Sequence, residues 1–139
     1  MPKDHFMGSL KTILQSIIIA LAMSSAGNPA FARAPEPQDP LKFFAACAGR
    51  LSAEMEFQWM FDGDAADAFA AERAAVLDIL EAMMSDDQGR DVLNWRVEAK
   101  MAQAALLTRA TFTNDARAAR HSAKLALYNV ESCRAMLLS

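Results

Sequence analysis

The two cysteines of this chain are the residues whose type and spacing imply chemistry most clearly. Cys47 and Cys133 are its only cysteines, and they lie near the two ends of the segment that follows residue 39. Thiols that a fold brings to the same height join as a disulfide in an oxidising compartment. The sequence therefore predicts a Cys47–Cys133 disulfide, with two buried free thiols as the alternative.

Combinations of side chains for catalysis are missing from the sequence. His121 is the only histidine after residue 32, so a zinc site or a thiolate activated by histidine has too few residues once the cysteines are paired. The chain contains no CxxC, CxxCH, GxSxG, HExxH or glycine-rich phosphate loop. The acidic segment at residues 62–64 has the wrong order of Asp and Gly for a calcium loop. We therefore predict no catalytic residue, no metal ligand and no cofactor, and a protein that is not an enzyme.

A carrier of haem or metal is the alternative that the residues leave open. Four-helix haem carriers of the cytochrome b562 type hold iron between a methionine of the first helix and a histidine of the last, which invites a comparison with Met55 and His121. The comparison is one of architecture, without a shared motif. At about 100° per residue, His121 falls opposite the apolar face of its helix and so toward solvent, which disfavours a haem site. The other methionines lack the clustered spacing of copper sites.

Glu72 is a carboxylate that falls inside a predicted apolar face, between Phe69 and Val76. A buried carboxylate needs a partner, and the commoner arrangement is a structural ion pair, here with Arg109 or Lys100. The alternative is an acid with a raised pKa that takes part in proton chemistry. We predict a structural role.

The first 32 residues have the parts of an export signal, and the other histidine of the chain, His5, lies within them. A short basic segment leads into an apolar stretch from Ile13 to Met23, and a helix-breaking segment then leads to the small-x-small triplet at residues 30–32. We predict a signal peptide over residues 1–32, cleaved after Ala32, and a periplasmic or secreted protein. An uncleaved membrane anchor is the alternative, but a spanning helix needs about 20 mainly apolar residues, roughly twice this stretch.

The predicted mature chain begins with a proline-rich tether over residues 33–38 and continues as a helical domain over residues 39–139. Asp39 and Pro40 supply a helix cap and a proline at the first helical position, and this helix is expected to run to Phe61. Three polar breaks then separate further helices, at residues 62–64, 86–90 and 111–114.

The glycines and aspartates of these breaks are assigned to helix ends. We expect Gly63 and Gly89 to end helices in the left-handed conformation, and Asp64 and Asp91 to cap the helices that follow. No segment alternates apolar and polar residues as strands do, and proline is absent after Pro40. The fold class is therefore predicted to be all-α.

Apolar residues recur at helical spacing in each of the four segments, so each helix has one face for a core. In the first helix this face comprises Phe44, Ala48, Leu51, Met55 and Trp59. Four helices joined by short breaks favour an antiparallel up-down-up-down four-helix bundle. Such a bundle brings the start of the first helix and the end of the last to one end, where Cys47 and Cys133 can meet.

Charge limits the classes of partner. The chain has 14 Lys and Arg against 17 Asp and Glu, a net charge of −3, and the charges are interspersed. A protein that tracks phosphates or binds an anionic lipid surface needs a basic cluster, which is not found after the leader. We therefore predict no nucleic-acid partner, and contact with a membrane only through a membrane-protein partner.

Apolar residues outside the predicted core faces indicate a docking surface for a protein. The residues of this predicted surface are Phe43, Phe57 and Met60 in the first helix, and His121, Leu125, Tyr128 and Met136 in the last. Burial of these residues on neighbouring helices is the alternative. We predict an exported protein that binds a protein partner or itself, as an accessory or assembly factor.

Overall fold

The computed structural model describes residues 39–138. The chain divides into two units, residues 1–32 and residues 33–139, and the described residues belong to the second. The predicted leader, its cleavage position and the predicted tether lie outside the described residues.

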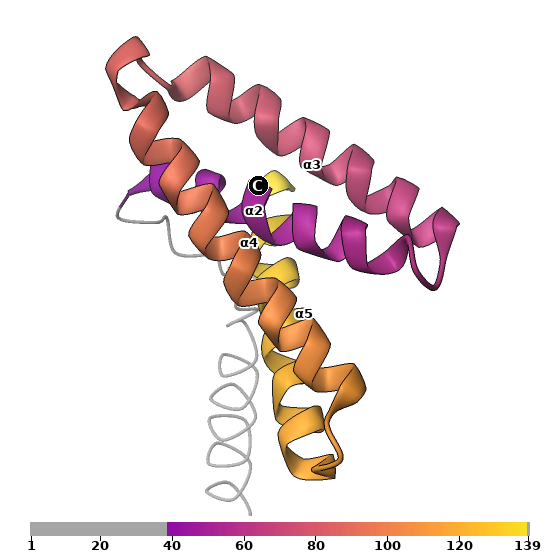
Figure 1. Ribbon diagram of the computed structural model, residues 1–139. Coiled ribbons are helices and arrows are strands. Elements are labelled where there is room, and N and C mark those ends of the chain that lie inside the picture. The colour runs from indigo at the N-terminus through magenta and orange to yellow at the C-terminus, as the bar shows by residue number, and fades with distance from the viewer. Residues whose placement is uncertain (1–38, 139) are drawn as a thin grey trace, which may run out of the picture. The chain divides into compact units, whose positions relative to one another are not determined.

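The described residues form four α-helices and one short 3-10 turn (Figure 1). The helices are α2 (Pro40–Gln58), α3 (Gly63–Met83), α4 (Gly89–Phe112) and α5 (Ala116–Leu137), and the 3-10 turn η1 (Asp86–Gln88) precedes α4. No strand occurs in this part of the chain, which confirms the predicted all-α class.

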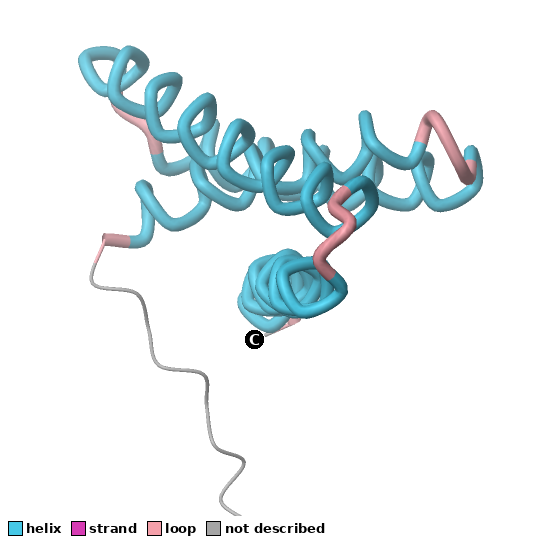
Figure 2. The backbone as a smooth tube through the Cα atoms, turned by 60° about the horizontal axis from the view of Figure 1, so that its bottom comes forward, coloured by secondary structure: helices cyan, strands magenta, loops and turns pink. Residues whose placement is uncertain are grey.

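Helix α2 contacts each of the other three α-helices, and α4 also packs against α5. Helices α2 and α3 run back along each other as one hairpin, and α4 and α5 form a second hairpin (Figure 1, Figure 2). In Figure 1, α4 crosses in front of α2, and no other described helix lies in front of α4. The predicted up-down-up-down order of a bundle is not confirmed by these contacts and stays a prediction.

The cysteine pair joins α2 to α5. The Sγ atoms of Cys47 and Cys133 are 2.06 Å apart and their Cα atoms 5.6 Å apart, which is the spacing of a disulfide. Both side chains are buried in the main apolar cluster of the described residues. The predicted pairing of these two cysteines is confirmed.

Helix α2 crosses α4 at a glycine. A Cβ atom added to Gly49 would overlap the carbonyl oxygen of Arg96 and lie 3.0 Å from the backbone nitrogen of Lys100. Only a residue without a side chain allows the two backbones to approach this closely. Gly49 therefore determines how α2 and α4 sit against each other.

The cap predicted for the first helix is present. The Asp39 side chain accepts a hydrogen bond from the backbone nitrogen of Lys42 at 3.0 Å, and Pro40 occupies the first helical position. The helix ends three residues earlier than predicted, at Gln58, and Trp59, predicted to face the core, is 63% exposed in the turn that follows.

The assignments at the other two helix starts were wrong. Asp62 rather than Asp64 caps α3, because its side chain accepts from the backbone nitrogen of Ala65 at 3.1 Å. Helix α4 begins at Gly89, so Asp91 lies inside its first turn and does not cap it. Gly63 and Gly89 begin helices, and no described glycine has a positive φ. The observed cap position lies two residues before the predicted one in α3 and three residues before it in α4, where it is Gln88.

Candidate binding site

A buried carboxylate lies where α2 meets α4 and α5. Glu54 of α2 is only 6% exposed, and its Oε1 accepts a hydrogen bond from Nε2 of Gln103 in α4 at 2.7 Å. The same Nε2 donates to the carbonyl oxygen of Ala126 at 3.0 Å, and Oε1 of Gln103 accepts from Nδ2 of Asn129 at 2.9 Å. Gln103 therefore uses both amide hydrogens and its oxygen to hold Glu54 against α5.

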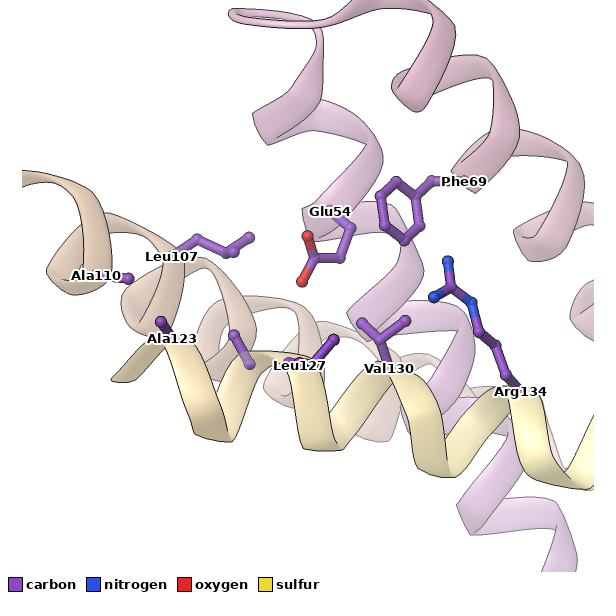
Figure 3. Close-up of a pocket in the computed structure, with 9 residues that line it drawn as sticks. Glu54, Phe69, Leu107, Ala110, Ala123, Leu127, Val130 and Arg134 are labelled. Atoms are coloured by element: carbon purple, nitrogen blue, oxygen red, sulfur yellow. The ribbon is translucent and has the colours of Figure 1, made fainter. Parts of the chain in front are cut away.

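Glu54 lines a pocket of about 220 Å³ to which all four α-helices contribute, here called the Glu54 pocket. Its other lining residues are Phe69, Leu107, Ala110, Ala123, Ala126, Leu127, Val130 and Arg134. Figure 3 shows the carboxylate reaching from α2 into the pocket, toward the row of apolar side chains on α5. The pocket thus combines apolar walls with one inward-facing acid.

One oxygen of this carboxylate is left for a ligand. Among the described residues, Oε1 of Glu54 accepts from Gln103, whereas Oε2 has no hydrogen-bond partner. Every fully buried side-chain oxygen or nitrogen in this part of the chain has a partner, so Oε2 is not fully buried, and Figure 3 shows its carboxylate in the pocket. Burial raises the pKa of Glu54, while the hydrogen bond from Gln103 and the charge of Arg134 oppose the rise.

Arg134, at the edge of the pocket, is engaged elsewhere. Its Nε and Nη2 donate to the carboxylate of Glu72 at 2.9 to 3.1 Å, and its Nη1 donates to Glu131 at 2.8 Å. The guanidinium also lies 5.4 Å from the centre of the Phe69 ring. The structure places Glu72 in an ion pair, as predicted, but the partner is Arg134 rather than Arg109 or Lys100.

A second groove lies between α2, α3 and α4 and has a basic lining. Its volume is about 250 Å³, and it includes Arg73, Arg96 and Lys100. Lys100 forms an ion pair with Glu56 at 2.6 Å, and Nε of Arg73 donates to Oγ of Ser52 at 2.7 Å. These two bonds use one donor of Arg73 and one of Lys100.

Helix α4 has an exposed row of apolar side chains, of which Leu93 and Val97 also line the groove shared with α2 and α3. Leu93, Val97, Met101 and Phe112, here called the α4 stripe, are 52% to 65% exposed. A shallow hollow of about 600 Å³ continues the stripe between Met101 and Phe112 and includes Ala104 and Thr108. The four-residue spacing of Leu93, Val97 and Met101 indicates a second apolar face of this helix. It was not recognised from the sequence because only one apolar face was assigned to each helix.

The seven residues of the predicted docking surface differ in burial. Met60, His121, Leu125 and Tyr128 are exposed, whereas Phe43, Phe57 and Met136 are half-buried. Phe43 and Met136 pack against the main apolar cluster, and the ring of Phe57 lies 5.0 Å from that of Phe61. The exposed members lie at the end of α2 and along α5, so they lie outside the α4 stripe.

None of the helices in residues 39–138 combines the length and the apolar character needed to cross a membrane. In the same range, no group of three or more His, Cys, Asp or Glu side chains is arranged to hold a metal ion.

Comparison of the chain with protein-family models, with curated proteins and with solved structures found no match.

Proposed function

We propose that this protein acts in the periplasm by protein–protein binding, as an accessory or assembly factor that docks through a helix face. The observation that carries the proposal is the α4 stripe, whose four large apolar side chains are each more than half exposed on one helix. Contiguous apolar surface of this kind marks interaction sites, whereas single exposed apolar residues are common and need no explanation. The predicted leader and the disulfide-spaced cysteines support export.

The occupant of the α4 stripe that we favour is the same helix of a second copy. An antiparallel pair of α4 helices, related by a two-fold axis, aligns the two stripes along about 29 Å at 1.5 Å per residue. The pairs in this register are Leu93 with Phe112, Val97 with the methyl-bearing side chain of Thr108, and Met101 with Ala104. Each side chain of one stripe then covers the other stripe, which removes apolar surface from water.

In this register, charged residues beside the stripe of one copy lie near residues of opposite charge in the other copy. Glu98 and Arg109 are exposed and lie on the same flank of α4, about 20° apart around the helix axis at 100° per residue. The same flanks face each other in an antiparallel helix pair, so Glu98 of each copy lies near Arg109 of the other. Exposed ion pairs contribute about 0.2 to 1 kcal/mol each, so we expect them to select the register rather than supply the affinity.

Sedimentation of the oxidised mature protein tests the proposal. We expect a dimer that Met101→Glu weakens about a hundredfold or more, because the two-fold axis places two buried carboxylates in one interface. Tyr128→Glu is the matched control, since it changes an equally exposed side chain on α5 and should leave the dimer intact.

A charge exchange tests the register. Glu98→Arg and Arg109→Glu should each weaken the dimer, and the two together should restore it, because the double variant again pairs opposite charges. A protein that stays monomeric at every concentration, or single variants without effect on a dimer, would refute this docking mode.

A further inference from the structure

We propose that the Glu54 pocket binds a primary ammonium group carried on a short alkyl chain. This inference goes beyond the proposed function and does not depend on it, because the pocket and the α4 stripe share no residue. It depends on three observations: a carboxylate oxygen without a partner, apolar walls, and a negative local charge.

The unpartnered oxygen of the Glu54 carboxylate indicates that the polar end of the ligand is a hydrogen-bond donor. Glu54 is more than nine-tenths buried, and its Oε2 has no hydrogen-bond partner among the described residues. A neutral apolar ligand would remove water from this oxygen and offer nothing in return, which is unfavourable. An ammonium group donates a hydrogen bond to it and stabilises its ionised form.

The charged groups around the pocket favour a cation over an anion. Arg134 of α5 lines the pocket, but Glu72 of α3 and Glu131 of α5 both bind its guanidinium. With Glu54 included, three carboxylates face one guanidinium. From α4, the side chain that bonds Glu54 is the uncharged amide of Gln103. An anion would meet this negative surplus at close range, whereas an ammonium ion reduces it.

The walls define the rest of the ligand. Leu107, Leu127 and Val130 present methyl groups to the pocket, and Phe69 closes one side (Figure 3). The volume of about 220 Å³ exceeds many times the roughly 10 to 15 Å³ that a single water needs, so an alkyl chain of a few carbons can enter with its ammonium end at Glu54. An aliphatic stem with a terminal ammonium group is also the chemistry of a lysine side chain.

The test is a titration of the oxidised mature protein with n-butylamine, n-butanol and butyrate, followed by NMR of the Gln103 side-chain amide. That amide reports locally because it donates to Glu54. We expect saturable shifts with butylammonium, binding of butanol weaker by about tenfold or more, and no binding of butyrate. Equal binding of butanol and butylammonium, or no binding of butylammonium, would overturn the proposal.

Variants separate the charge from the cavity. Glu54→Gln keeps an acceptor for Gln103 and should abolish the preference for butylammonium over butanol. Leu127→Trp leaves Glu54 unchanged but fills the mouth of the pocket, so both probes should lose binding. Tyr128→Trp is the matched control on the neighbouring exposed position, which does not line the pocket, and should have no effect. Circular dichroism establishes that each variant is folded, and retained preference in folded Glu54→Gln protein would contradict the proposal.

A second pair of probes distinguishes the sources of the ammonium group. N-acetyl-lysine amide presents the side chain that a protein partner would insert, and N-acetyl-norleucine amide is its uncharged match. Binding of the lysine compound with the affinity of butylamine supports the proposal and assigns the group to a protein. Binding of butylamine alone supports it and assigns the group to a free amine. The dimerisation experiment reads out mass instead, so the failure of one proposal is distinguishable from the failure of the other.

Discussion

The carboxylate of Glu54 makes the free energy of unfolding depend on pH. Burial raises its pKa above the ordinary value of 4.5, so the folded chain holds this proton more tightly than the unfolded chain. The contribution of Glu54 to the free energy of unfolding is therefore fully present below the unfolded pKa and is lost as the pH rises through the folded pKa.

Glu54→Gln should therefore stabilise the protein in a pH-dependent way. The amide oxygen can still accept from Gln103, but no charge has to be buried. We expect the gain in Tm over the unchanged chain to be larger at about pH 8 than at about pH 5, measured by thermal unfolding. Glu81→Gln, at an exposed position of α3, is the control and should show no such difference. An equal gain at both pH values would mean that the carboxylate is not destabilised by burial.

A second prediction for a single residue concerns Gly49 and the stability of the fold. Gly49→Ala places a methyl group against the backbone of Arg96 and Lys100, which cannot move as a side chain can. We expect a loss of about 1 to 3 kcal/mol in the free energy of unfolding, measured with denaturant. Gly63→Ala is the matched control because a Cβ there meets no atom within 4 Å, and it should be neutral or slightly stabilising. Similar effects of the two substitutions would contradict the close crossing of α2 and α4.

The residues of the Glu54 pocket could not be recognised from the sequence. Glu54 and Gln103 are 49 positions apart, and neither belongs to a motif. Their burial arises because α2 packs against α4 and α5 packs against both, which local spacing does not encode. Glu72, by contrast, was recognisable as an ion-pair residue from its position among apolar neighbours, although the choice of Arg134 as partner again depends on the packing of α3 near α5.

The helices are the part of the structure that could be predicted best from the sequence. All four were predicted from apolar periodicity and polar breaks, and the first cap was assigned to the correct residue. The start of α3 was misplaced because Asp62 and Asp64 are chemically equivalent caps. The start of α4 was misplaced because no side chain caps this helix, so Asp91 is not the cap that its residue type suggests. The α4 stripe shows a further limit, since periodicity detects an apolar face but cannot tell whether another element covers it.

The disulfide ties two elements that are far apart in the chain. Cys47 and Cys133 are separated by 86 residues, so the crosslink restricts a long loop of the unfolded chain. Replacing both by alanine should lower the free energy of unfolding by up to about 4.6 kcal/mol on chain-entropy grounds. Chemical denaturation of the double variant against the oxidised protein measures the loss. Unchanged stability would mean that the crosslink does not hold α5 against α2.

For the whole molecule, the proposed function requires an oxidising compartment and a dimeric state. A disulfide is kept oxidised where an export signal would deliver the protein. We expect dimerisation through the α4 stripe to leave the Glu54 pocket open, since no residue of the stripe lines the pocket. A dimer would thus present two such pockets to a protein partner.

Docking through the α4 stripe can be measured as the native mass of the untagged protein, recovered from a periplasmic extract under non-reducing conditions and compared with that of Met101→Glu. We predict a chain that begins at Arg33, lacks two hydrogens because of the disulfide, and appears as a dimer that Met101→Glu converts to a monomer. A monomer without any bound polypeptide, identical in both preparations, would contradict protein binding through the α4 stripe.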